Sequence, residues 1–569
     1  MKTFNILIGG EAGQGLVSVG NILLRAITKE GWYLFAHQDY ESRIRGGHNF
    51  FKFRLANQPV YAGENRIDLL VALDKTSINR HQEDLGEAGI VFYDPKVVGK
   101  EIDQPNFLPI SFVDIAVEQG QLIVMANAVA AGAIWALLSD NLTNLVAVLT
   151  EMFKEKGSAI VEGNVKVAEA GFNFVRQSFA EIQRPEKPAD QSKRIVLQGN
   201  QALPSGALAA GVKFMSAYPM TPATGVTEFI AAYGEKCSVI MEQAEDEIAA
   251  INMAIGAAYA GVRAMTATSG GGFALMTEAL GYAGAAEIPV VVINAQRPGP
   301  STGLPTRTEQ GDLLFAVTTS FSDFPKAVLA PGDVEEAFYL MSTAFNLAER
   351  YQMPVIVLSD QHLADSYQTV APFDLSKIAI DRGAVVNGAA TSDKYLRYRD
   401  TDSGISPRLY PGFGEGLVVS AGDEHDEAGH LVEDIESRVK MMDKRMRKMI
   451  GVYNEALDPV TYGSDQPEYV LIGFGSTKGA IREAVDLLET YGYPGLAVHL
   501  PQVYPLPASL AKILKGPGKK FIVESNFTGQ LYRLLSMEFA WKADGRVRRY
   551  DGRPINAEYI IDWLIGGES

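Results

Sequence analysis

The feature that most constrains the fold is a recurring order of short apolar run, glycine- or proline-containing turn, and helical stretch. Apolar runs of roughly four to eight residues bounded by turns are typical of buried strands, and helices that alternate with them connect parallel neighbours. Between residues 194 and 372, strands are expected at 213–217, 238–241, 263–267, 289–295 and 354–358. The sequence therefore predicts an α/β fold here.

The N-terminal segment repeats this order. An apolar run at 4–8 leads through Gly9-Gly10-Glu11-Ala12-Gly13-Gln14-Gly15 into a helix whose apolar residues, among them Leu16, Val19, Ile22 and Leu23, share one face. Further strands are expected at 32–36, 67–73 and 89–93, which favours a parallel α/β layout here too.

Changes in pattern divide the chain into five segments. We expect a first α/β domain at 1–182, a polar linker with two prolines at 183–193, and a second α/β domain at 194–375. A charged, turn-rich connecting segment with a long helix follows at 376–465. A smaller α/β domain occupies 466–569.

Composition excludes several classes of protein. Cys237 is the only cysteine among 569 residues, so the chain alone can hold neither an internal disulfide nor an iron–sulfur cluster. A formal charge of −17 argues against a nucleic-acid partner. No apolar run reaches the roughly 18 residues needed to cross a membrane. The N-terminus enters a strand pattern without a signal-peptide layout, which indicates a cytoplasmic protein.

The stretch Tyr218-Pro219-Met220-Thr221-Pro222-Ala223-Thr224 follows a predicted strand. Thr221 before Pro222 is typical of a helix N-cap with proline at the first helical position. The N–H groups at such a helix start suit a carboxylate or phosphate. The alternative is a helix cap with no ligand.

An acidic cluster, Glu245-Asp246-Glu247, opens the almost wholly apolar stretch 248–261. Acidic residues at a helix start are favoured by the helix dipole, which is reason enough for Glu245 and Asp246. Glu247 lies where the apolar helix begins, so packing is expected to remove it from water and let it hold a proton.

Two glycine-rich turns follow later strands. Thr266-Ala267-Thr268-Ser269-Gly270-Gly271-Gly272 lets backbone approach a flat ligand, but is equally typical of a tight strand-to-helix turn. The loop from Gln296 to Asp312 contains Arg297 and Arg307, whose guanidinium groups suit carboxylates and phosphates. The alternative is a surface loop with solvated charges.

Together these stretches resemble the 2-oxoacid:acceptor (ferredoxin) oxidoreductase family, most closely the alpha subunit of 2-oxoglutarate:ferredoxin oxidoreductases. Residues 218–224 are similar to the family signature Tyr-Pro-Ile-Thr-Pro-Ser-Thr and depart from it at Met220 and Ala223. Residues 245–250 and 299–310 also match. Gly13-Gln14-Gly15 and Arg43-Ile44-Arg45-Gly46-Gly47 resemble the family's gamma domain, fused here ahead of the pyrimidine-binding domain.

The resemblance implies a gamma-type α/β domain at 1–182, a thiamine-diphosphate pyrimidine-binding α/β domain at 194–375 and a transketolase-C-like α/β domain at 466–569. Glu247 would bond to N1′ of the pyrimidine and favour the imino tautomer, which removes the thiazolium C2 proton. Thr221, Arg297 and Arg307 would bind the oxoacid or coenzyme A. Tyr218, Pro219, Ser269 and Gly270 would contact the cofactor.

The resemblance also implies what lies outside the chain. The diphosphate, its Mg²⁺ and a [4Fe-4S] cluster would sit on a smaller beta subunit in an α2β2 assembly, with ferredoxin as electron acceptor. The implied reaction is reversible oxidative decarboxylation of 2-oxoglutarate to succinyl-CoA, which in reverse fixes carbon dioxide. No metal ligand is expected on this chain.

Three other stretches are interpreted more simply. Asp423–His430, with two histidines and several carboxylates, is more typical of a solvated charged turn than of a metal site. The helix 439–449 is expected to pack through Val439, Met442, Met446 and Met449, with Lys440, Lys444, Arg447 and Lys448 around that face. The stretch 524–530 resembles a family segment expected at an interface.

Competing interpretations remain open. Within the enzyme class, the substrate could instead be pyruvate, a branched-chain or an aryl 2-oxoacid. A non-catalytic scaffold or acyl-CoA-binding regulator is the alternative from another class, and Glu247 argues against it. A transketolase-like enzyme acting alone is disfavoured, because the chain lacks a Gly-Asp-Gly diphosphate motif.

Overall fold

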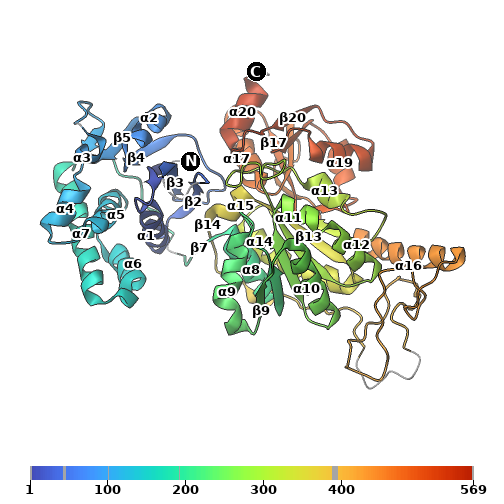
Figure 1. Cartoon of the computed structure of the whole chain (residues 1–569). Coiled ribbons are helices and arrows are strands. Elements are labelled where there is room, and N and C mark those ends of the chain that lie inside the picture. Colours follow the sequence, from blue (N-terminus) through green and yellow to red (C-terminus); the bar gives the residue numbers. More distant parts are fainter. Residues whose placement is uncertain (1–2, 43–45, 100, 191, 387–394, 567–569) are drawn as a thin grey trace. The chain divides into compact units, whose positions relative to one another are not determined.

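A computed structural model describes residues 3–42, 46–99, 101–190, 192–386 and 395–566 (Figure 1). Arg43, Ile44 and Arg45, part of the gamma-like stretch, lie outside these residues. The chain divides into two compact units: residues 1–197 with 366–372, and residues 198–365 with 373–569. Each unit combines helices with β-sheet, which confirms the predicted α/β class.

The first unit is built on an eight-stranded sheet in the order β6-β5-β4-β1-β3-β2-β14-β7. Its strands are β1 (Thr3–Ala12), β2 (Tyr33–Asp39), β3 (Gly46–Ala56), β4 (Ile67–Ala72), β5 (Leu85–Tyr93), β6 (Phe107–Pro109), β7 (Ile195–Gln198) and β14 (Ser366–Val370).

The fully parallel layout expected for this segment is wrong. Strands β1, β4, β5 and β6 are parallel neighbours, but β3, which the sequence patterns did not reveal, runs antiparallel to both β1 and β2. Residues 40–45 connect β2 to β3, and so short a connection cannot make the crossover that parallel neighbours need.

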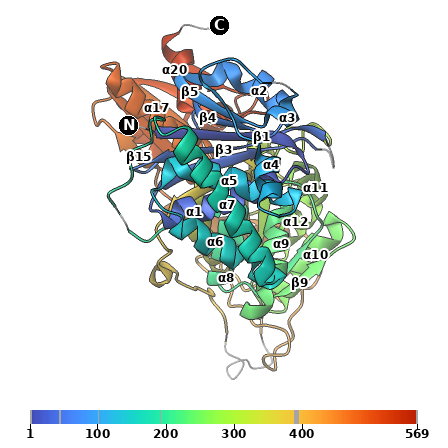
Figure 2. The same ribbon diagram turned by 90° about the vertical axis from the view of Figure 1, so that its left-hand side faces the viewer.

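Helices of the first unit cover the sheet as the apolar pattern requires. The face predicted for α1 (Leu16–Lys29) is buried. Helix α5 (Ala126–Leu138) is buried at nearly every position and packs on α1 and α7 (Ser158–Ser178) (Figure 2). Gly132 makes this possible, because a Cβ there would lie 2.0 Å from the carbonyl oxygen of Ala168. The others are α2 (Lys75–His81), α3 (Pro95–Val98), α4 (Phe112–Glu118) and α6 (Thr143–Phe153).

The second unit contains a seven-stranded sheet in the order β18-β12-β13-β11-β10-β8-β9. Its strands are β8 (Phe214–Ala217), β9 (Ile240–Gln243), β10 (Ala264–Thr268), β11 (Val290–Gln296), β12 (Ala327–Leu329), β13 (Pro354–Asp360) and β18 (Gln502–Tyr504). All neighbours are parallel except β18 against β12. The expected strands lie within a few residues of those observed.

The helices around this sheet are α8 (Gly199–Ala209), α9 (Thr224–Tyr233), α10 (Glu247–Tyr259), α11 (Gly270–Leu275), α12 (Thr277–Ala285), α13 (Leu313–Val317), α14 (Val334–Tyr351) and α15 (Gln361–Asp365). In Figure 1 several of them, α8, α9 and α10 among them, flank the sheet in green. None of the helices within the described ranges is long and apolar enough to cross a membrane.

The C-terminal part of the second unit forms a five-stranded sheet, β15-β17-β16-β19-β20. Its elements are β15 (Val460–Gly463), β16 (Tyr469–Phe474), α17 (Thr477–Thr490), β17 (Gly495–Leu500), α18 (Leu510–Lys515), β19 (Lys519–Glu524), α19 (Gln530–Phe539), β20 (Gly545–Arg548) and α20 (Ala557–Ile565). Buried residues of both sheets, such as Ile356 and Ile472, share one core.

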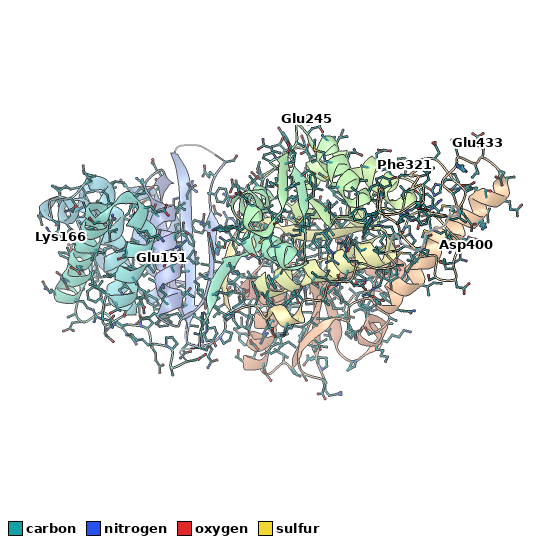
Figure 3. The ribbon with its side chains drawn as sticks, turned by 90° about the horizontal axis from the view of Figure 1, so that it is seen from below. Glu151, Lys166, Glu245, Phe321, Asp400 and Glu433 are labelled. Carbon is teal, nitrogen blue, oxygen red and sulfur yellow. The ribbon has the colours of Figure 1, made fainter. Side chains whose placement is uncertain are left out.

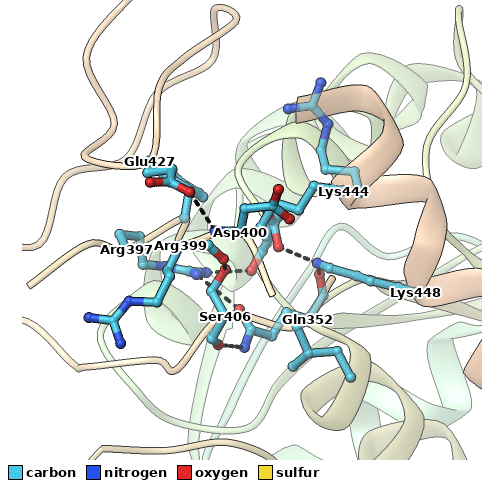
Figure 4. A network of polar contacts seen from close by, with 12 residues as sticks. Gln352, Arg397, Arg399, Asp400, Ser406, Glu427, Lys444 and Lys448 are labelled. Carbon is cyan, nitrogen blue, oxygen red and sulfur yellow. Dashed lines mark hydrogen bonds and ion pairs between the residues drawn. The ribbon is translucent and has the colours of Figure 1, made fainter. Parts of the chain in front are cut away.

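Buried ion pairs attach the connecting segment to the rest of the second unit. On α16 (Ile435–Asn454), Lys444 and Lys448 are fully buried and both pair with the buried carboxylate of Glu287, Lys444 Nζ at 2.5 Å. Figure 4 shows the two lysines reaching in from the helix. The packing face predicted for this helix is therefore wrong in part: Val439 is exposed, whereas the two lysines expected beside the apolar face point into the interior.

The stretch Asp423–His430 is a turn, but it is solvated only in part. His425 is fully buried, and its Nδ1 lies 2.9 Å from the carbonyl oxygen of Asp423. Arg445 on α16 donates two hydrogen bonds, of 2.8 and 2.7 Å, to the carboxylate of Glu424, which also pairs with Arg438. These contacts of Glu424 fix α16 against the stretch. Among the residues with described positions, no group of three or more His, Cys, Asp or Glu could hold a metal.

Candidate active site

Four of the sequence motifs meet at one edge of the seven-stranded sheet. They follow β8, β9, β10 and β11, which are parallel neighbours in the order β11-β10-β8-β9. The carboxyl ends of parallel strands lie at the same edge of a sheet, and ligands bind there in α/β folds. The topology thus brings together segments that are 79 residues apart in the chain, from Tyr218 to Arg297.

Glu247 is the first residue of α10. Asp246 caps this helix by accepting a hydrogen bond of 2.7 Å from the backbone N–H of Ala249, so the acidic cluster lies at a helix start, as expected. Glu247 itself is 4% exposed, and its Oε1 has no hydrogen-bond partner among the described residues. A buried carboxylate oxygen without a partner is costly, so this atom fits a ligand that donates a hydrogen bond.

The glycine-rich turn after β10 lies against this carboxylate. A Cβ on Gly272 would lie 2.6 Å from Glu247 Oε1 and 2.1 Å from Thr268 Oγ1. Ser269 is also fully buried, and its hydroxyl is without a partner in the described parts of the chain. Gly270 begins α11. The turn thus combines free backbone and a buried, unpartnered hydroxyl with the unpartnered carboxylate oxygen of Glu247 against it, which fits the flat, polar edge of an aminopyrimidine.

The turn at 218–223 is tied to two of the other motifs. Thr268 Oγ1 donates to the sulfur of Met220 at 3.8 Å, and Arg297 Nη1 donates to the carbonyl oxygen of Thr221 at 2.6 Å. Tyr218 and Pro219 are exposed beside them. The structure therefore groups Tyr218, Thr221 and Arg297 with the strand edge that carries Glu247.

The helix cap expected at Thr221 is wrong. Helix α9 begins at Thr224, and its N-cap is Ala223, which makes no side-chain cap hydrogen bond. The carbonyl oxygen of Pro222 accepts from the side-chain amide of Asn200 at 2.8 Å, while the N–H of Val226 donates to Ala223. The helix thus begins two residues later than a Thr221 cap requires.

Arg307 lies elsewhere along the loop. Its neighbour Thr308 donates a backbone hydrogen bond of 3.1 Å to Gly552, and a Cβ on Gly552 would lie 3.1 Å from the Cβ of Arg307. Gln310 Nε2 similarly donates to the carbonyl oxygen of Phe474 at 2.8 Å. Arg307 is therefore positioned where the loop contacts the C-terminal sheet region, whereas Arg297 lies at the strand edge.

Two acidic residues of this loop were given no role in the sequence analysis. Asp312 accepts a hydrogen bond of 3.1 Å from the amide of Asn294, and a Cβ on Gly270 would lie 2.6 Å from its carboxylate. Burial raises the pKa of Asp312, and burial together with the charge of Asp312 raises the pKa of Glu309 to about 7. Glu309 and Asp312 lie three residues apart in the loop that follows the buried strand β11, and this spacing is the sequence pattern that could have indicated them.

The stretch 524–530 is an anchor within the second unit, and its expected position at an interface stays a prediction. Gln310 donates its backbone N–H to Ser525 at 2.6 Å, and Asn526 Nδ2 donates to the carbonyl oxygen of Gln310 at 3.1 Å. Glu524 is fully buried at the end of β19 and accepts from the amide of Asn526 at 2.6 Å. These contacts fix the loop that carries Arg307, Glu309 and Asp312.

The sheet edge and the buried glutamate lie within a thiamine-diphosphate-binding domain. Residues 205–444 match the family described as pyruvate flavodoxin/ferredoxin oxidoreductase, thiamine diphosphate-binding, and residues 5–174 match pyruvate ferredoxin/flavodoxin oxidoreductase. The chain belongs to the 2-oxoacid:ferredoxin oxidoreductases, in which it corresponds to the alpha subunit. It is thus a subunit of an oxidoreductase.

Similarity extends over nearly the whole chain. The 2-oxoacid:ferredoxin oxidoreductase alpha subunit of Sulfolobus sp. is 32% identical over 98% of this chain and 96% of its own length. The 2-oxoglutarate oxidoreductase subunit KorA of Mycobacterium tuberculosis is 29% identical over 93% of this chain and 86% of its own. A solved 2-oxoglutarate:ferredoxin oxidoreductase from Magnetococcus marinus, with 2-oxoglutarate, coenzyme A and succinyl-CoA bound, superposes with a TM-score of 0.92 at 31% identity, covering 99% of each chain.

Proposed function

We propose that this chain is the alpha subunit of an enzyme that converts 2-oxoglutarate and coenzyme A to succinyl-CoA and carbon dioxide. Two electrons leave the substrate and pass singly to two oxidised ferredoxins, and one proton is released. The reverse reaction uses the same groups. The observation that carries the proposal is Glu247, a buried carboxylate with one oxygen unbonded among the described residues, against a glycine turn.

The carboxyl group of Glu247 would share a proton with N1′ of the cofactor's pyrimidine ring. Bonded to N1′ of the pyrimidine, its carboxyl group favours the imino tautomer, and low exposure keeps water from competing for that proton. Ser269, Gly270 and the backbone of the turn would contact the pyrimidine, with Tyr218 and Pro219 at its outer side. When bound, thiamine diphosphate supplies the carbon nucleophile that attacks the oxoacid carbonyl.

Arg297 and Thr221 are the proposed contacts of the oxoacid carboxylate. The guanidinium of Arg297 is half-buried and already oriented by the carbonyl oxygen of Thr221, so less side-chain entropy is lost when a carboxylate binds. Arg307, beside Gly552, is the proposed contact for the other end of the substrate or for coenzyme A.

A smaller beta subunit is proposed to complete the site. Large apolar side chains of the second unit are exposed: Ile248 next to Glu247, Leu275 at the end of α11, and Phe321, which is 72% exposed. Large exposed apolar side chains mark interaction surfaces. The partner would carry the diphosphate site, Mg²⁺ and a [4Fe-4S] cluster in an α2β2 assembly, since this chain has one cysteine.

The test is reduction of a viologen dye by the chain, alone and with its beta subunit, in the presence of coenzyme A. 2-Oxoglutarate, pyruvate and a branched-chain 2-oxoacid are supplied separately, because the matching family description names pyruvate. We expect activity only with the partner, and the highest kcat/KM with 2-oxoglutarate.

Glu247→Gln should lower kcat by roughly 10²- to 10⁴-fold while the complex still assembles. Glu245→Gln, an exposed neighbour, is the matched control and should keep wild-type activity. Preference for another oxoacid would change the substrate but keep the mechanism. Absence of any coenzyme-A-dependent activity from an intact, cluster-loaded complex would instead favour the non-catalytic scaffold.

A further inference from the structure

Helix α16 presents an apolar stripe at its surface. The large apolar and aromatic side chains of this helix that stay exposed or partly exposed are Ile435, Val439, Met442, Met446, Ile450 and Tyr453. We call these six residues the outer stripe. Ile435 is 84% exposed and Ile450 is 63% exposed. Figure 1 shows α16, in orange, at the border of the second unit, and Figure 3 shows Glu433, just before α16, at that border too.

The opposite face of α16 has the charges that a surface helix normally turns to water. Lys444 and Lys448 are fully buried and paired with Glu287, and Met441 and Met449 are buried beside them. Helix α16 therefore cannot turn its outer stripe inward without breaking these ion pairs. Surface helices usually bury the apolar face instead, and exposed apolar side chains that gather on one face mark an interaction surface.

The spacing of the outer stripe is typical of helices that pack side by side. Its members follow one another at intervals of four, three, four, four and three residues. At 3.6 residues per turn they fall within an arc of about 80° on one side of the helix. Apolar intervals of three and four form the seam between paired helices, whose axes lie about 8–10 Å apart.

The same spacing is symmetric about the middle of the helix to within one residue. Counted from position 444, its members lie nine, five and two residues before, and two, six and nine residues after. Two such helices in antiparallel contact pair Ile435 with Tyr453, Val439 with Ile450, and Met442 with Met446. A two-fold interface has this property, because each contact between residues i and j occurs twice. A different partner would require no symmetry in the stripe.

We propose that the outer stripe joins two copies of this chain, with their α16 helices antiparallel across a two-fold axis. No residue of the stripe belongs to the candidate active site, so the inference does not rest on the proposed chemistry. The proposed α2β2 assembly contains two copies of the chain, and α16 would supply a contact between them.

Cysteine cross-linking of the full-length chain tests the orientation of the helices. In a Cys237→Ser background, the cysteine of Met442→Cys lies about 6 Å along the axis from its counterpart in the other copy, at 1.5 Å per residue. For Ile435→Cys and for Tyr453→Cys this distance is about 27 Å. We expect a short bismaleimide to cross-link Met442→Cys chains but neither of the other two variants alone. When Ile435→Cys and Tyr453→Cys chains are co-expressed, they should cross-link to each other.

The double variant Val439→Glu/Ile450→Glu tests the contact itself. Sedimentation velocity should show a dimer of the wild-type chain. The double variant should self-associate at least about a hundredfold more weakly, because a symmetric interface buries each new charge twice. Leu122→Glu is the matched control, since Leu122 of the first unit is 63% exposed, as Ile450 is, and should leave the dimer intact. Circular dichroism checks that each variant is folded.

Several outcomes would overturn the proposal: a monomeric wild-type chain, unchanged self-association of the double variant, or no cross-links in Met442→Cys. Cross-linking of Ile435→Cys chains to one another would indicate a parallel pair and overturn it as well. If the double variant stayed dimeric but no longer bound the beta subunit, the stripe would belong to that partner instead. The viologen assay of the complex is a separate measurement, so a failure here leaves the proposed function standing.

Discussion

At the residue scale, Glu247 meets two opposing demands. A helix start favours a carboxylate through its dipole, while burial at the beginning of an apolar helix disfavours one. Gly272 resolves the second demand, because the absence of a side chain leaves the space that Glu247 Oε1 occupies. The carboxylate is therefore placed by the turn after β10 as much as by its own helix.

Gly272→Ala should remove most activity. Its Cβ would lie 2.1 Å from Thr268 Oγ1 and 2.6 Å from Glu247 Oε1, so Glu247 must move from its position facing the proposed pyrimidine site. We expect a loss of at least about tenfold in kcat/KM, since a misplaced catalytic group costs one to two orders of magnitude.

Gly271→Ala is the matched control from the same turn. The nearest atom to its Cβ is Met220 Cε at 3.7 Å, an ordinary contact. Steady-state assays of both variants, with thiamine diphosphate content measured on the purified complexes, provide the comparison. If Gly271→Ala and Gly272→Ala lost activity equally, the position of Glu247 would not be what the turn controls.

At the element scale, charged side chains attach the connecting segment. Burial alone would raise the pKa of Glu287, but Lys448 and Lys444 together hold it well below its usual range, while burial lowers the pKa of Lys448 to about 7. Arg397 adds a hydrogen bond of 2.7 Å from its Nη2 to the backbone carbonyl of Glu287. Figure 4 shows Arg397, Lys444 and Lys448 in one network of polar contacts. Helix α16 is thus fixed through ion pairs.

Glu424→Gln should weaken this attachment in a pH-dependent way. Burial would raise the pKa of Glu424, but hydrogen bonds from Arg445 and Arg438 lower it to about 2. Because the folded-state pKa is lower than the unfolded one, the ionised carboxylate stabilises the fold above about pH 4.5. That contribution is lost as pH falls from about 4.5 to 2. At pH 7 we expect a loss of about 1–3 kcal/mol, allowing for solvent screening.

Thermal midpoints of the variant and the wild-type chain, measured at pH 7, 5 and 4, check this expectation. The gap between them should be constant above about pH 5 and should narrow below it. Glu433→Gln, which removes an exposed carboxylate just before the same helix (Figure 3), is the control and should leave the midpoint unchanged. A gap that widens toward acid pH would contradict the assignment.

At the scale of the whole molecule, the chain forms two units, and the first unit includes a strand whose sequence lies between segments of the second. Strand β14 leaves the second unit, enters the first unit's sheet beside β2, and the chain then returns. Two compact units with separate cores can unfold separately. The four tryptophans divide evenly, with Trp32 and Trp135 in the first unit and Trp541 and Trp563 in the second.

Urea unfolding of two double variants should therefore give different midpoints. Trp541→Phe/Trp563→Phe reports the first unit through the remaining tryptophans, and Trp32→Phe/Trp135→Phe reports the second. Two-state unfolding requires that different probes give coincident transitions, so separate midpoints show separate units. The far-ultraviolet circular dichroism of each variant is the control, because it follows both units together. Coincident midpoints in all measurements would mean that the whole chain unfolds cooperatively.

The sequence by itself determined the α/β class, most strands of the second unit and the segments that meet at its candidate site. These depend on periodicity and turn residues within some ten to twenty positions, which act locally. The resemblance, carried by residues 218–224, 245–250 and 299–310, led to the family that the comparisons confirm. The start of α10 at the acidic cluster was likewise expected from neighbouring residues alone.

Only the tertiary structure decided the remaining features. Three pairings depend on segments that are distant in the chain. Strand β3 lies antiparallel to β1, β14 joins the first unit's sheet beside β2, and β18 lies antiparallel to β12 in the seven-stranded sheet. Lys444 and Lys448 have the composition of a solvated helix face, yet they are buried because Glu287, some 160 residues earlier, meets them there. Local patterns predict which helices and strands form. Long-range packing and charge pairing decide how these elements are arranged, because the energies of packing and pairing depend on partners that are absent from the local sequence.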